Sequence, residues 1–251
     1  YTYINIINNY FSDVYNGFDY GVYFNDGFYI DGPEFDSEFI LNYINNEIRN
    51  LDYWGYGAYF SQAENYRIVT VLVDSNDFIS TLSGSTGYAI YFDGFYYEDE
   101  MYDAYFDFDF TNNNIENLTY MGLYISYVEN YRFTYIDIIN NYISDIYNDF
   151  EYGIYIDGCY VDSTDYYSEA FLNVLNNEFR DGAYWAYAVY FYEFGNYHLT
   201  VVEIDNNDFI STSSNTLGYG VYFDYLYFDD DMYDTHLYFN ATNNVMENLN
   251  S

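Results

Sequence analysis

The side chains that could do acid–base or metal chemistry in this chain are almost all acidic. Its 251 residues include 41 Asp and Glu, four Arg, no Lys, two His and one Cys, for a formal net charge of −37 at pH 7. Nucleic acids and anionic membranes are bound mainly through Lys and Arg. No run of 18 apolar residues that could insert into a membrane is present. The composition therefore excludes nucleic acid as a partner and predicts no membrane insertion.

The few basic residues recur at fixed spacings and do not gather at one point. Arg67, Arg132 and His198 occupy one repeated position, and Arg49 and Arg180 occupy another. Residues repeated in this way are expected to be counter-charges in acidic columns. A carboxylate pair at glycosidase spacing cannot be recognised among so many acids. We therefore predict no catalytic residues and no enzymatic activity.

Two acidic clusters, 131 residues apart, are candidate Ca²⁺ ligands, since oxygen-rich clusters can bind this ion. They consist of Glu98, Asp99, Glu100, Asp229, Asp230 and Asp231. Their spacing matches neither the EF-hand nor the nonapeptide calcium repeat, and a solvated acidic face is the alternative. One Cys, Cys159, and two His speak against a zinc site and exclude an internal disulfide.

Two N-glycosylation sequons are present, Asn117-Leu118-Thr119 and Asn240-Ala241-Thr242. The Asn240 sequon falls in a column of polar residues that is predicted to face outward. Chance matches are common in a chain so rich in Asn. The two sequons nevertheless make Asn117 and Asn240 candidate acceptors and predict a glycoprotein.

All these residues are set within a repeat marked by a pair of polar residues, usually Asn-Asn, followed two positions later by a large apolar residue. The second Asn of each copy stands at Asn9, Asn46, Asn76, Asn113, Asn141, Asn177, Asn207 and Asn244. Successive copies are 28 to 37 residues apart, with long and short units alternating. Apolar residues five and three positions before this Asn flank a position that is polar in seven of eight copies. That alternation indicates a strand with one buried face.

A second strand follows in seven of the copies, typified by Tyr20-Gly21-Val22-Tyr23-Phe24. Its second position is always Gly or Ala, which predicts tight space there. Its fourth position is always Tyr: Tyr23, Tyr59, Tyr91, Tyr124, Tyr155, Tyr190 and Tyr222. We expect these side chains to point outward and stack as an aromatic ladder. The ladder would either stabilise the sheet or form a lateral interface or a platform for glycans.

Identical strands that return at this spacing, with no helical segment between them, predict an all-β fold, a parallel β-helix solenoid of about eight coils. The 41 Tyr, 23 Phe and single Pro agree with strands. The recurrent Asn is expected to form a hydrogen-bonded ladder at a coil corner. Residues 1–251 are expected to form one solenoid, with an internal duplication of about 131 residues that relates 1–130 to 131–251.

This pattern resembles the right-handed parallel β-helix repeats of pectin-lyase-like proteins. It is most similar to the Asn-rich repeats of adhesin-like and surface-fibre proteins of archaea and bacteria. Segments such as Asn140-Asn141-Tyr142-Ile143 followed by Tyr152-Gly153-Ile154-Tyr155-Ile156 carry the resemblance. It implies a right-handed, single-stranded solenoid. The family includes lyases, hydrolases, adhesins and structural proteins, so the resemblance leaves function open.

Among these functions we expect a structural, extracellular or cell-surface protein, the repeat unit of a filament, sheath or surface layer. Neither end shows a capping segment, and the chain starts at Tyr1 where a Met would be expected. Both features predict an excised segment or a chain that stacks end to end with copies of itself. The alternative is an adhesin-type or carbohydrate-binding rod that binds through its Tyr ladder and Ca²⁺. A polysaccharide lyase or hydrolase is the third hypothesis.

Overall fold

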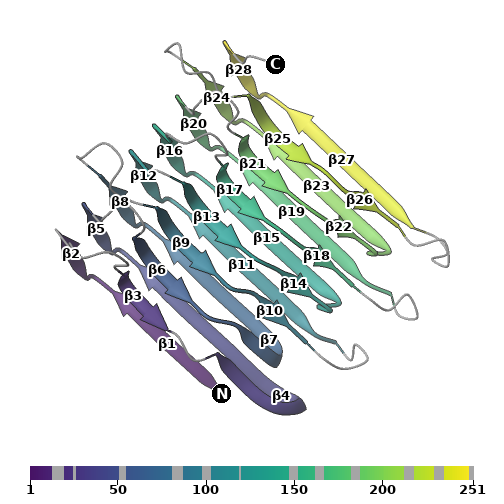
Figure 1. The fold of residues 1–251 in the computed structure, drawn as a ribbon. Coiled ribbons are helices and arrows are strands. Elements are labelled where there is room, and N and C mark those ends of the chain that lie inside the picture. Colours follow the sequence, from purple (N-terminus) through teal and green to yellow (C-terminus); the bar gives the residue numbers. More distant parts are fainter. Residues whose placement is uncertain are drawn as a thin grey trace.

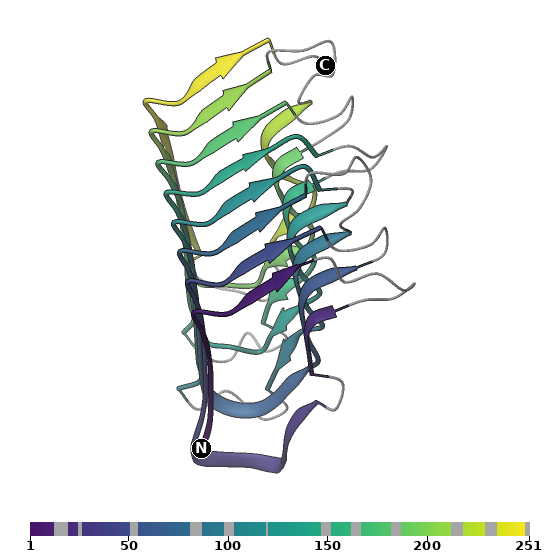
Figure 2. The ribbon, with the colours of Figure 1, turned by 90° about the vertical axis from the view of Figure 1, so that its left-hand side faces the viewer.

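The computed structural model describes twelve segments of the chain. They are residues 1–12, 20–24, 27–50, 55–80, 87–97, 103–118, 120–146, 152–161, 167–181, 187–211, 218–228 and 235–248, with the backbone alone for 30–35. Within them the chain is all-β: every described element is a strand, and each strand pairs in parallel with the equivalent strand one turn away. The strands therefore lie in rows, and each turn rests on the turn before it (Figures 1 and 2). The predicted fold class, a parallel β-solenoid, is confirmed.

The strand that leads into each polar pair belongs to the largest sheet, which we call the wide sheet. Its leading strands are β1 (Thr2–Ile7), β4 (Phe28–Ile44), β7 (Ala63–Asp74), β11 (Tyr105–Thr111), β15 (Phe133–Ile139), β19 (Glu169–Leu175), β23 (Leu199–Asp205) and β27 (His236–Thr242). Buried and half-buried residues alternate along β15 and β19, as the period-two pattern predicts.

The strand immediately after each second Asn belongs to the asparagine sheet, which has eight strands. These are β2 (Tyr10–Ser12), β5 (Glu47–Arg49), β8 (Asp77–Ile79), β12 (Asn114–Glu116), β16 (Tyr142–Ser144), β20 (Glu178–Arg180), β24 (Asp208–Ile210) and β28 (Val245–Glu247). The polar pair is thus the corner between the wide sheet and the asparagine sheet. Each strand here is only three residues long, and its central apolar residue points into the core.

The tyrosine sheet forms another side and has seven strands. They are β3 (Tyr20–Phe24), β6 (Tyr56–Phe60), β9 (Tyr88–Phe92), β13 (Met121–Ile125), β17 (Tyr152–Ile156), β21 (Tyr187–Phe191) and β25 (Tyr219–Phe223). The second residue of the strand has no register partner in any of the six pairs. This irregularity breaks the period of two. The second, third and fifth residues of β6, β9, β13 and β17 are buried, while the two Tyr or Met positions are half-buried.

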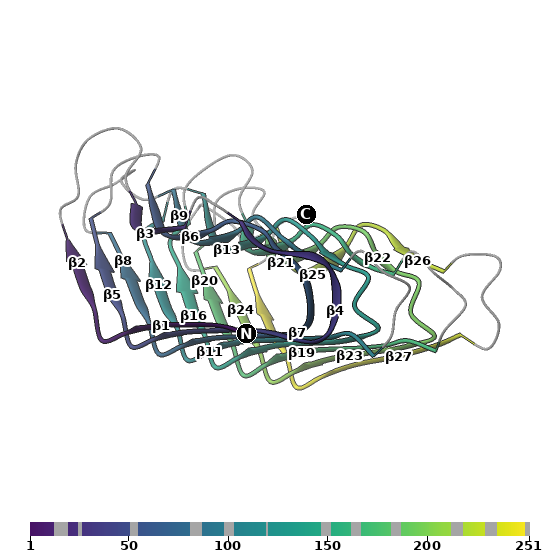
Figure 3. The same ribbon diagram turned by 90° about the horizontal axis from the view of Figure 1, so that it is seen from below.

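A further set of short strands closes each turn and was missed in the sequence, because a two-residue strand is too short to show a period. It consists of β10 (Phe95–Tyr96), β14 (Val128–Glu129), β18 (Cys159–Tyr160), β22 (Phe194–Gly195) and β26 (Leu226–Tyr227). The long strands β4 and β7 run through the bend between these short strands and the leading strands, so all thirteen strands count as one sheet. Figure 3 shows β4 curving around this end of the flattened cross-section.

The core is a stack of like residues, because parallel in-register turns place each side chain on its equivalent. Ile136 lies between Phe108 and Leu172 in register, and all three are fully buried. Fully burying a large apolar side chain stabilises a fold by about 1.5–3 kcal/mol. The continuous apolar columns therefore hold the turns together without a disulfide or any helix in the described segments.

The number of complete turns is slightly smaller than the eight predicted. Seven turns place a strand in the tyrosine sheet, and the eighth consists of β27 and β28 in the described residues. Every residue of β27 and β28 is exposed. The exposed fraction is 55% for Phe239 and 61% for Met246, although both occupy positions that are buried in other turns. At the opposite end, Ile4, Ile6 and Phe11 are only partly buried. Both end turns thus leave core positions partly uncovered.

Candidate functional sites: the asparagine ladder and the tyrosine surface

The corner between the wide sheet and the asparagine sheet requires a left-handed backbone at the first residue of each polar pair. The φ angles there are +53° to +59° at Asn8, Asn45, Ser75, Asn112, Asn140, Asn176, Asn206 and Asn243. Asn tolerates this conformation better than other residues with a Cβ, because its short amide side chain can hydrogen-bond locally. The left-handed backbone therefore explains why the first residue of the pair is usually Asn.

The second Asn forms a continuous amide ladder through all eight turns. In each step, the backbone N–H and the side-chain Nδ2 of one Asn donate to the Oδ1 of the next, from Asn9 to Asn244. The N···Oδ1 distances are 2.8–3.1 Å, and the Nδ2···Oδ1 distances are 2.9–3.1 Å. From Asn46 onward, Nδ2 also donates to a backbone carbonyl of the preceding turn, as Asn141 does to Phe110 at 2.7 Å. The ladder satisfies amides that are almost fully buried, with Asn46, Asn113 and Asn141 at 2% exposure or less.

The ladder is polar, because every step donates in the same direction along the solenoid axis. At one end, no donor among the described residues contacts Oδ1 of Asn9, although its N–H and Nδ2 donate to Asn46. At the other end, Asn244 accepts from Asn207 and donates through Nδ2 to Ile204, and its backbone N–H has no acceptor in the described segments. The two ends of the ladder are therefore complementary, one an acceptor and the other a donor.

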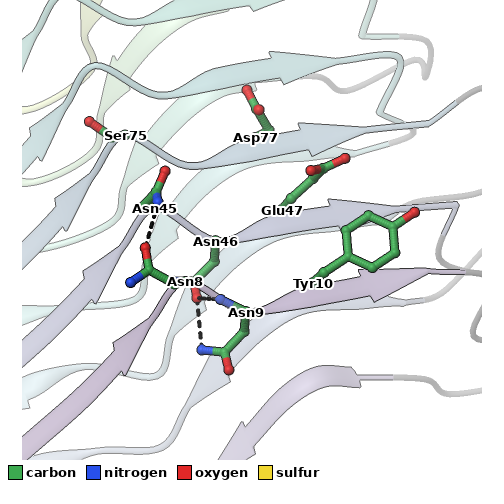
Figure 4. A pocket seen from close by; sticks show the side chains of 8 residues that line it. All are labelled: Asn8, Asn9, Tyr10, Asn45, Asn46, Glu47, Ser75 and Asp77. Atoms are coloured by element: carbon green, nitrogen blue, oxygen red, sulfur yellow. Dashed lines mark hydrogen bonds between the residues drawn. The ribbon is translucent and has the colours of Figure 1, made fainter.

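A surface depression of about 230 Å³ lies beside the first turns of the ladder (Figure 4). Its lining consists of Asn8, Asn9, Tyr10, Asn45, Asn46, Glu47, Ser75 and Asp77. Seven of these eight residue types recur 131 or 132 residues later in the chain, from Asn140 to Asp208. The depression is thus a property of the repeat, and its polar lining contains no group that is unique to it.

The outer face of the tyrosine sheet carries two neighbouring columns of Tyr, which together we call the tyrosine surface. One is the ladder recognised in the sequence, from Tyr23 to Tyr222, in which successive ring centroids are 4.6–5.4 Å apart. The other uses the first residue of each strand: Tyr20, Tyr56, Tyr88, Tyr152, Tyr187 and Tyr219, with Met121 in the fourth turn. Sequence reasoning missed this second column, although Tyr recurs there in six of seven strands.

Rings of the second column stack face to face, so their faces are covered by one another. Tyr56 stacks on Tyr88 at 4.9 Å with 5° between ring planes, and Tyr187 stacks on Tyr219 at 4.9 Å with 10°. In the first column, Tyr59 stacks on Tyr91 at 5.2 Å and 15°. Most members are half-buried, from Tyr23 at 45% exposure to Tyr190 at 8%. The second column therefore presents ring edges to solvent more than ring faces, whereas three of the six neighbouring pairs in the first column are tilted or T-shaped.

Carboxylates line one edge of the tyrosine surface in its third, fifth and seventh turns. Tyr190 donates its hydroxyl to Asp224 at 2.9 Å. Tyr155 and Tyr124 both donate to Asp157, at 3.1 and 3.3 Å. The residue after the fifth position of the strand is Asp93, Asp157 or Asp224 in alternate turns.

Burial and neighbouring carboxylates raise the pKa of several phenols of this surface. Burial raises the pKa of Tyr59 to about 12, and the Asp93 carboxylate adds to the rise. Burial also raises the pKa of Tyr124 to about 12. For Tyr155 burial and then the Asp157 carboxylate raise the pKa further. The tyrosine surface is therefore a neutral band on a strongly acidic chain.

The Gly or Ala at the second strand position is explained by the neighbouring turn. A Cβ on Gly57 would lie 2.5 Å from the carbonyl oxygen of Ala89 and 2.8 Å from the Phe78 ring. A Cβ on Gly153 would lie 2.6 Å from the Ala188 oxygen and 3.3 Å from Phe179. The tight space predicted from the sequence is thus present between the tyrosine sheet and the apolar residues of the asparagine sheet.

Three of the four Arg lie beside carboxylates, and they do not converge. Arg49 contacts Glu47, and Arg180 contacts Glu178, in equivalent strands. Arg132 lies 3.2 Å from Asp103 and 5.2 Å from the centre of the Phe133 ring. His198, at the equivalent position, lies 3.3 Å from the Ser168 hydroxyl. The buried Nε of Arg67 has no hydrogen-bond partner among the described residues, so it does not act there as a counter-charge.

The candidate Ca²⁺ ligands Glu98, Asp99, Glu100, Asp229, Asp230 and Asp231 lie outside the described residues. Within the part of the chain that is described, no group of three or more His, Cys, Asp or Glu is placed to hold a metal ion. The same part contains no helix with the length and apolarity needed to cross a membrane. Cys159 is buried beside Tyr197, and burial raises the pKa of its thiol to about 12.

The two sequons differ in their surroundings. Asn240 is exposed on β27, with its side chain in the outward column of the wide sheet. Asn117 is half-buried at a left-handed corner with φ +60°, and Leu118 beside it is fully buried. Thr119 lies outside the described residues. Asn240 is therefore the more accessible acceptor.

No protein-family model, no curated protein and no solved structure shows significant similarity to this chain. The fold itself, a parallel β-solenoid, is shown by the strand pairing alone.

Proposed function

We propose that this chain is a structural repeat unit that assembles end to end with copies of itself into an extracellular filament, sheath or surface layer. The polarity of the asparagine ladder carries the proposal. Oδ1 of Asn9 and the backbone N–H of Asn244 are the acceptor and donor that each ladder step joins inside the chain. Contact between them would continue the ladder from one copy to the next.

The residues at the two ends support this junction, because it would reproduce an interface already present within the chain. The last turn, β27 and β28, is equivalent to β11 and β12, 131 residues earlier. The first turn, β1 and β2, is likewise equivalent to β15 and β16, which pair with β11 and β12 in register. Placing β1 and β2 of one copy on β27 and β28 of another therefore repeats an observed pairing with similar residue types. Among the described residues, the last strand of the tyrosine sheet is β25, one turn before β27 and β28.

Several contacts recur with the same offset, so the structural period follows the sequence period. Thr111 and Thr242 donate to Asp74 and Asp205. Ser37 and Ser168 donate to the carbonyls of Asn65 and Asn196. A second copy that continues this period would keep each column in register.

Exposed apolar residues at both ends give the junction its driving force. Large apolar side chains are exposed at Tyr1, Tyr3, Ile7, Tyr10, Leu237, Tyr238, Phe239, Val245 and Met246. Unpaired strand edges with apolar side chains pair readily with other chains. The two edges differ, so copies join head to tail. A row of copies joined in this way closes into a ring only if it curves. A contact of that kind generates an open filament.

The tyrosine surface favours this structural role over the alternative of a carbohydrate-binding rod. A platform for sugars presents the faces of its aromatic rings, whereas many rings here stack on each other and present their edges. The stacks instead stabilise the solenoid along its length. An extracellular location and a glycan on Asn240 are part of the proposal. They would be tested by mass spectrometry of the protein from its native source.

Electron microscopy of the purified chain tests the assembly directly. At micromolar concentration in high salt we expect unbranched filaments of constant width. Asn9→Ala, which removes the free ladder acceptor, should raise the concentration needed for filaments. Asn5→Ala is the matched control, because Asn5 lies on β1 of the same turn, outside the ladder, and its side chain is exposed.

Light scattering supplies the contrary outcome. A parent chain that stays monomeric at all concentrations, with the amides of β1 and β27 protected from hydrogen exchange, would rule out the junction. Equal behaviour of Asn9→Ala and Asn5→Ala would show that filaments form without the ladder contact.

A further inference from the structure

The first tyrosine column is unbroken over seven turns of the solenoid. Every turn from β3 to β25 contributes one phenol, and no gap between neighbouring ring centroids exceeds 5.4 Å. At about 4.8 Å per turn, its two end members lie on the order of 29 Å apart. Phenols at such short separations are in direct electronic contact, because their ring edges and faces touch.

The second column places an additional phenol beside the first column in every turn except the fourth, where it holds Met121. Tyr20, Tyr56, Tyr152 and Tyr187 each lie within 4.0–5.6 Å of the first-column Tyr of their own strand. In the fourth turn, Tyr124 contacts both Tyr91, at 4.6 Å, and Tyr155, at 5.1 Å. Tyr120, just before Met121, stacks on Tyr88 at 5.8 Å. Tyr124 is therefore the phenol that links the first-column rings on either side of the fourth turn.

Oxidation of a phenol by one electron releases its proton, so a phenol needs a base beside it to react readily. Asp157 accepts hydrogen bonds from Tyr124 and Tyr155, and Asp224 accepts one from Tyr190. Carboxylates of this edge stand in the third, fifth and seventh turns. The proton can thus move a single hydrogen-bond length and return when the electron is restored.

We propose that the tyrosine surface is a relay for one-electron oxidation, along which an electron vacancy passes from phenol to phenol parallel to the solenoid axis. In the first step a one-electron oxidant takes an electron from a Tyr, and the phenol proton leaves for a base. In each later step the tyrosyl radical takes an electron from the next phenol and regains a proton, while that next phenol releases its own. The base is the hydrogen-bonded carboxylate at Tyr124, Tyr155 and Tyr190, and solvent water serves at the other phenols. The chain is unchanged once the vacancy leaves it. The net charge of −37 favours a cationic oxidant. The relay acts within a single chain and does not require the filament.

A flash-photolysis experiment tests the relay. A ruthenium(II) polypyridyl maleimide is attached at Tyr23→Cys in a Cys159→Ala background. A cobalt(III) ammine salt quenches the excited label to ruthenium(III). Tyr222 is replaced by 3-aminotyrosine, which is more easily oxidised and traps the vacancy. We expect its radical in the transient absorption and electron paramagnetic resonance spectra.

The fourth turn provides the decisive comparison. Tyr124→Phe keeps the ring and removes the phenol that contacts both Tyr91 and Tyr155, so the gap between first-column phenols grows from about 5 to about 10 Å. We expect the rate of trap oxidation to fall, because electron exchange between phenols weakens steeply as this gap doubles. Tyr56→Phe is the matched control, because Tyr59 keeps the path open in that turn, and its rate should stay close to that of the parent. Tyr124→Trp restores a ring that can be oxidised and should recover the rate.

Two further outcomes bear on the relay. Asp157→Asn removes the base beside Tyr124 and Tyr155 and should slow the trap oxidation while the circular dichroism spectrum stays the same. The relay is overturned if the trap in the parent chain is not oxidised, or if Tyr124→Phe and Tyr56→Phe give equal rates. Neither outcome depends on whether the chain forms filaments, which is read separately by microscopy.

Discussion

At the scale of the residue, the two members of the polar pair have different tasks. The first residue adopts a left-handed backbone, and the second forms the buried ladder. Ser75 occupies the first position once, at φ +57°, which shows that this position selects for conformation rather than for an amide. The second position is Asn in every turn, because only an amide donates and accepts at the same point.

Asn141→Ala should therefore destabilise the chain more than Asn5→Ala. The first change leaves the buried N–H of Asn113 and the carbonyl of Phe110 without partners. An unpaired buried group costs about 1–3 kcal/mol. Asn5 only accepts a hydrogen bond from Asn42 on the exposed face. Equal shifts of the melting temperature for the two variants would contradict this role for the ladder.

The acidic column of the wide sheet should make stability depend on pH. Burial, and then the neighbouring carboxylates of Asp107 and Asp137, raise the pKa of Asp109 to about 6. In the unfolded chain an Asp has a pKa of about 3.9. Between these values the folded state binds more protons than the unfolded state, so stability falls as pH rises from about 4 to about 6.

Asp109→Asn should raise the melting temperature at pH 7 and flatten its dependence on pH in this window. Asp74 provides the contrast. Burial acts to raise its pKa, but hydrogen bonds from Thr111, Asn112 and Ser75 outweigh that effect and lower it. Asp74→Asn should lower the melting temperature at pH 7. If the melting temperatures of Asp109→Asn and the parent chain depended on pH in the same way, the fold would not raise the pKa of this carboxylate.

At the scale of the element, short strands are held by what lies on either side of them. The three-residue strands of the asparagine sheet are anchored by the ladder at their start and by a buried apolar residue at their centre. The strands of the tyrosine sheet pack closely against those apolar residues, which leaves no room for a larger side chain at the second position.

Gly57→Ala should destabilise the solenoid more than Gly153→Ala. Both new methyl groups would meet a backbone oxygen at nearly the same distance, but the Phe78 ring lies at 2.8 Å and the Phe179 ring at 3.3 Å. Forcing an extra methyl group into a packed core typically costs about 1–3 kcal/mol. Chemical denaturation of the two variants would measure the difference, and a larger cost at Gly153 would contradict the packing.

At the scale of the whole molecule, the charge opposes the assembly that the ends favour. The net charge of −37 is repeated on every copy, so stacking copies brings like charges together. Salt shortens the screening length from about 10 Å at 0.1 M to about 3 Å at 1 M. Apolar contacts and hydrogen bonds at the junction are less affected by salt.

Filament length should therefore increase with NaCl, and Ca²⁺ should act at lower concentration because it is divalent. Sedimentation of assembled material across a salt series measures this effect. Mg²⁺ at equal ionic strength is the control for charge alone. Assembly that is independent of salt would indicate that the carboxylates do not face each other across the junction.

The sequence by itself determined the solenoid, the position of its asparagine corner and the outward tyrosine column. These features are periodic, and a parallel stack places residues of equal phase in contact, so columns in an alignment become columns in space. The tight Gly or Ala position follows from the same reasoning.

Tertiary structure alone decided the features that are not periodic or that depend on direction. Strands of two residues, such as β18, are too short to leave a pattern, and they form because neighbouring turns pair with them. The polarity of the ladder, the face-to-face stacking of the second column and the approach of Asp157 to two phenols depend on side-chain orientation. Residue types and spacing do not encode the orientation of a side chain. It is set by the irregular second position of the tyrosine-sheet strands and by the packing of each turn on the next.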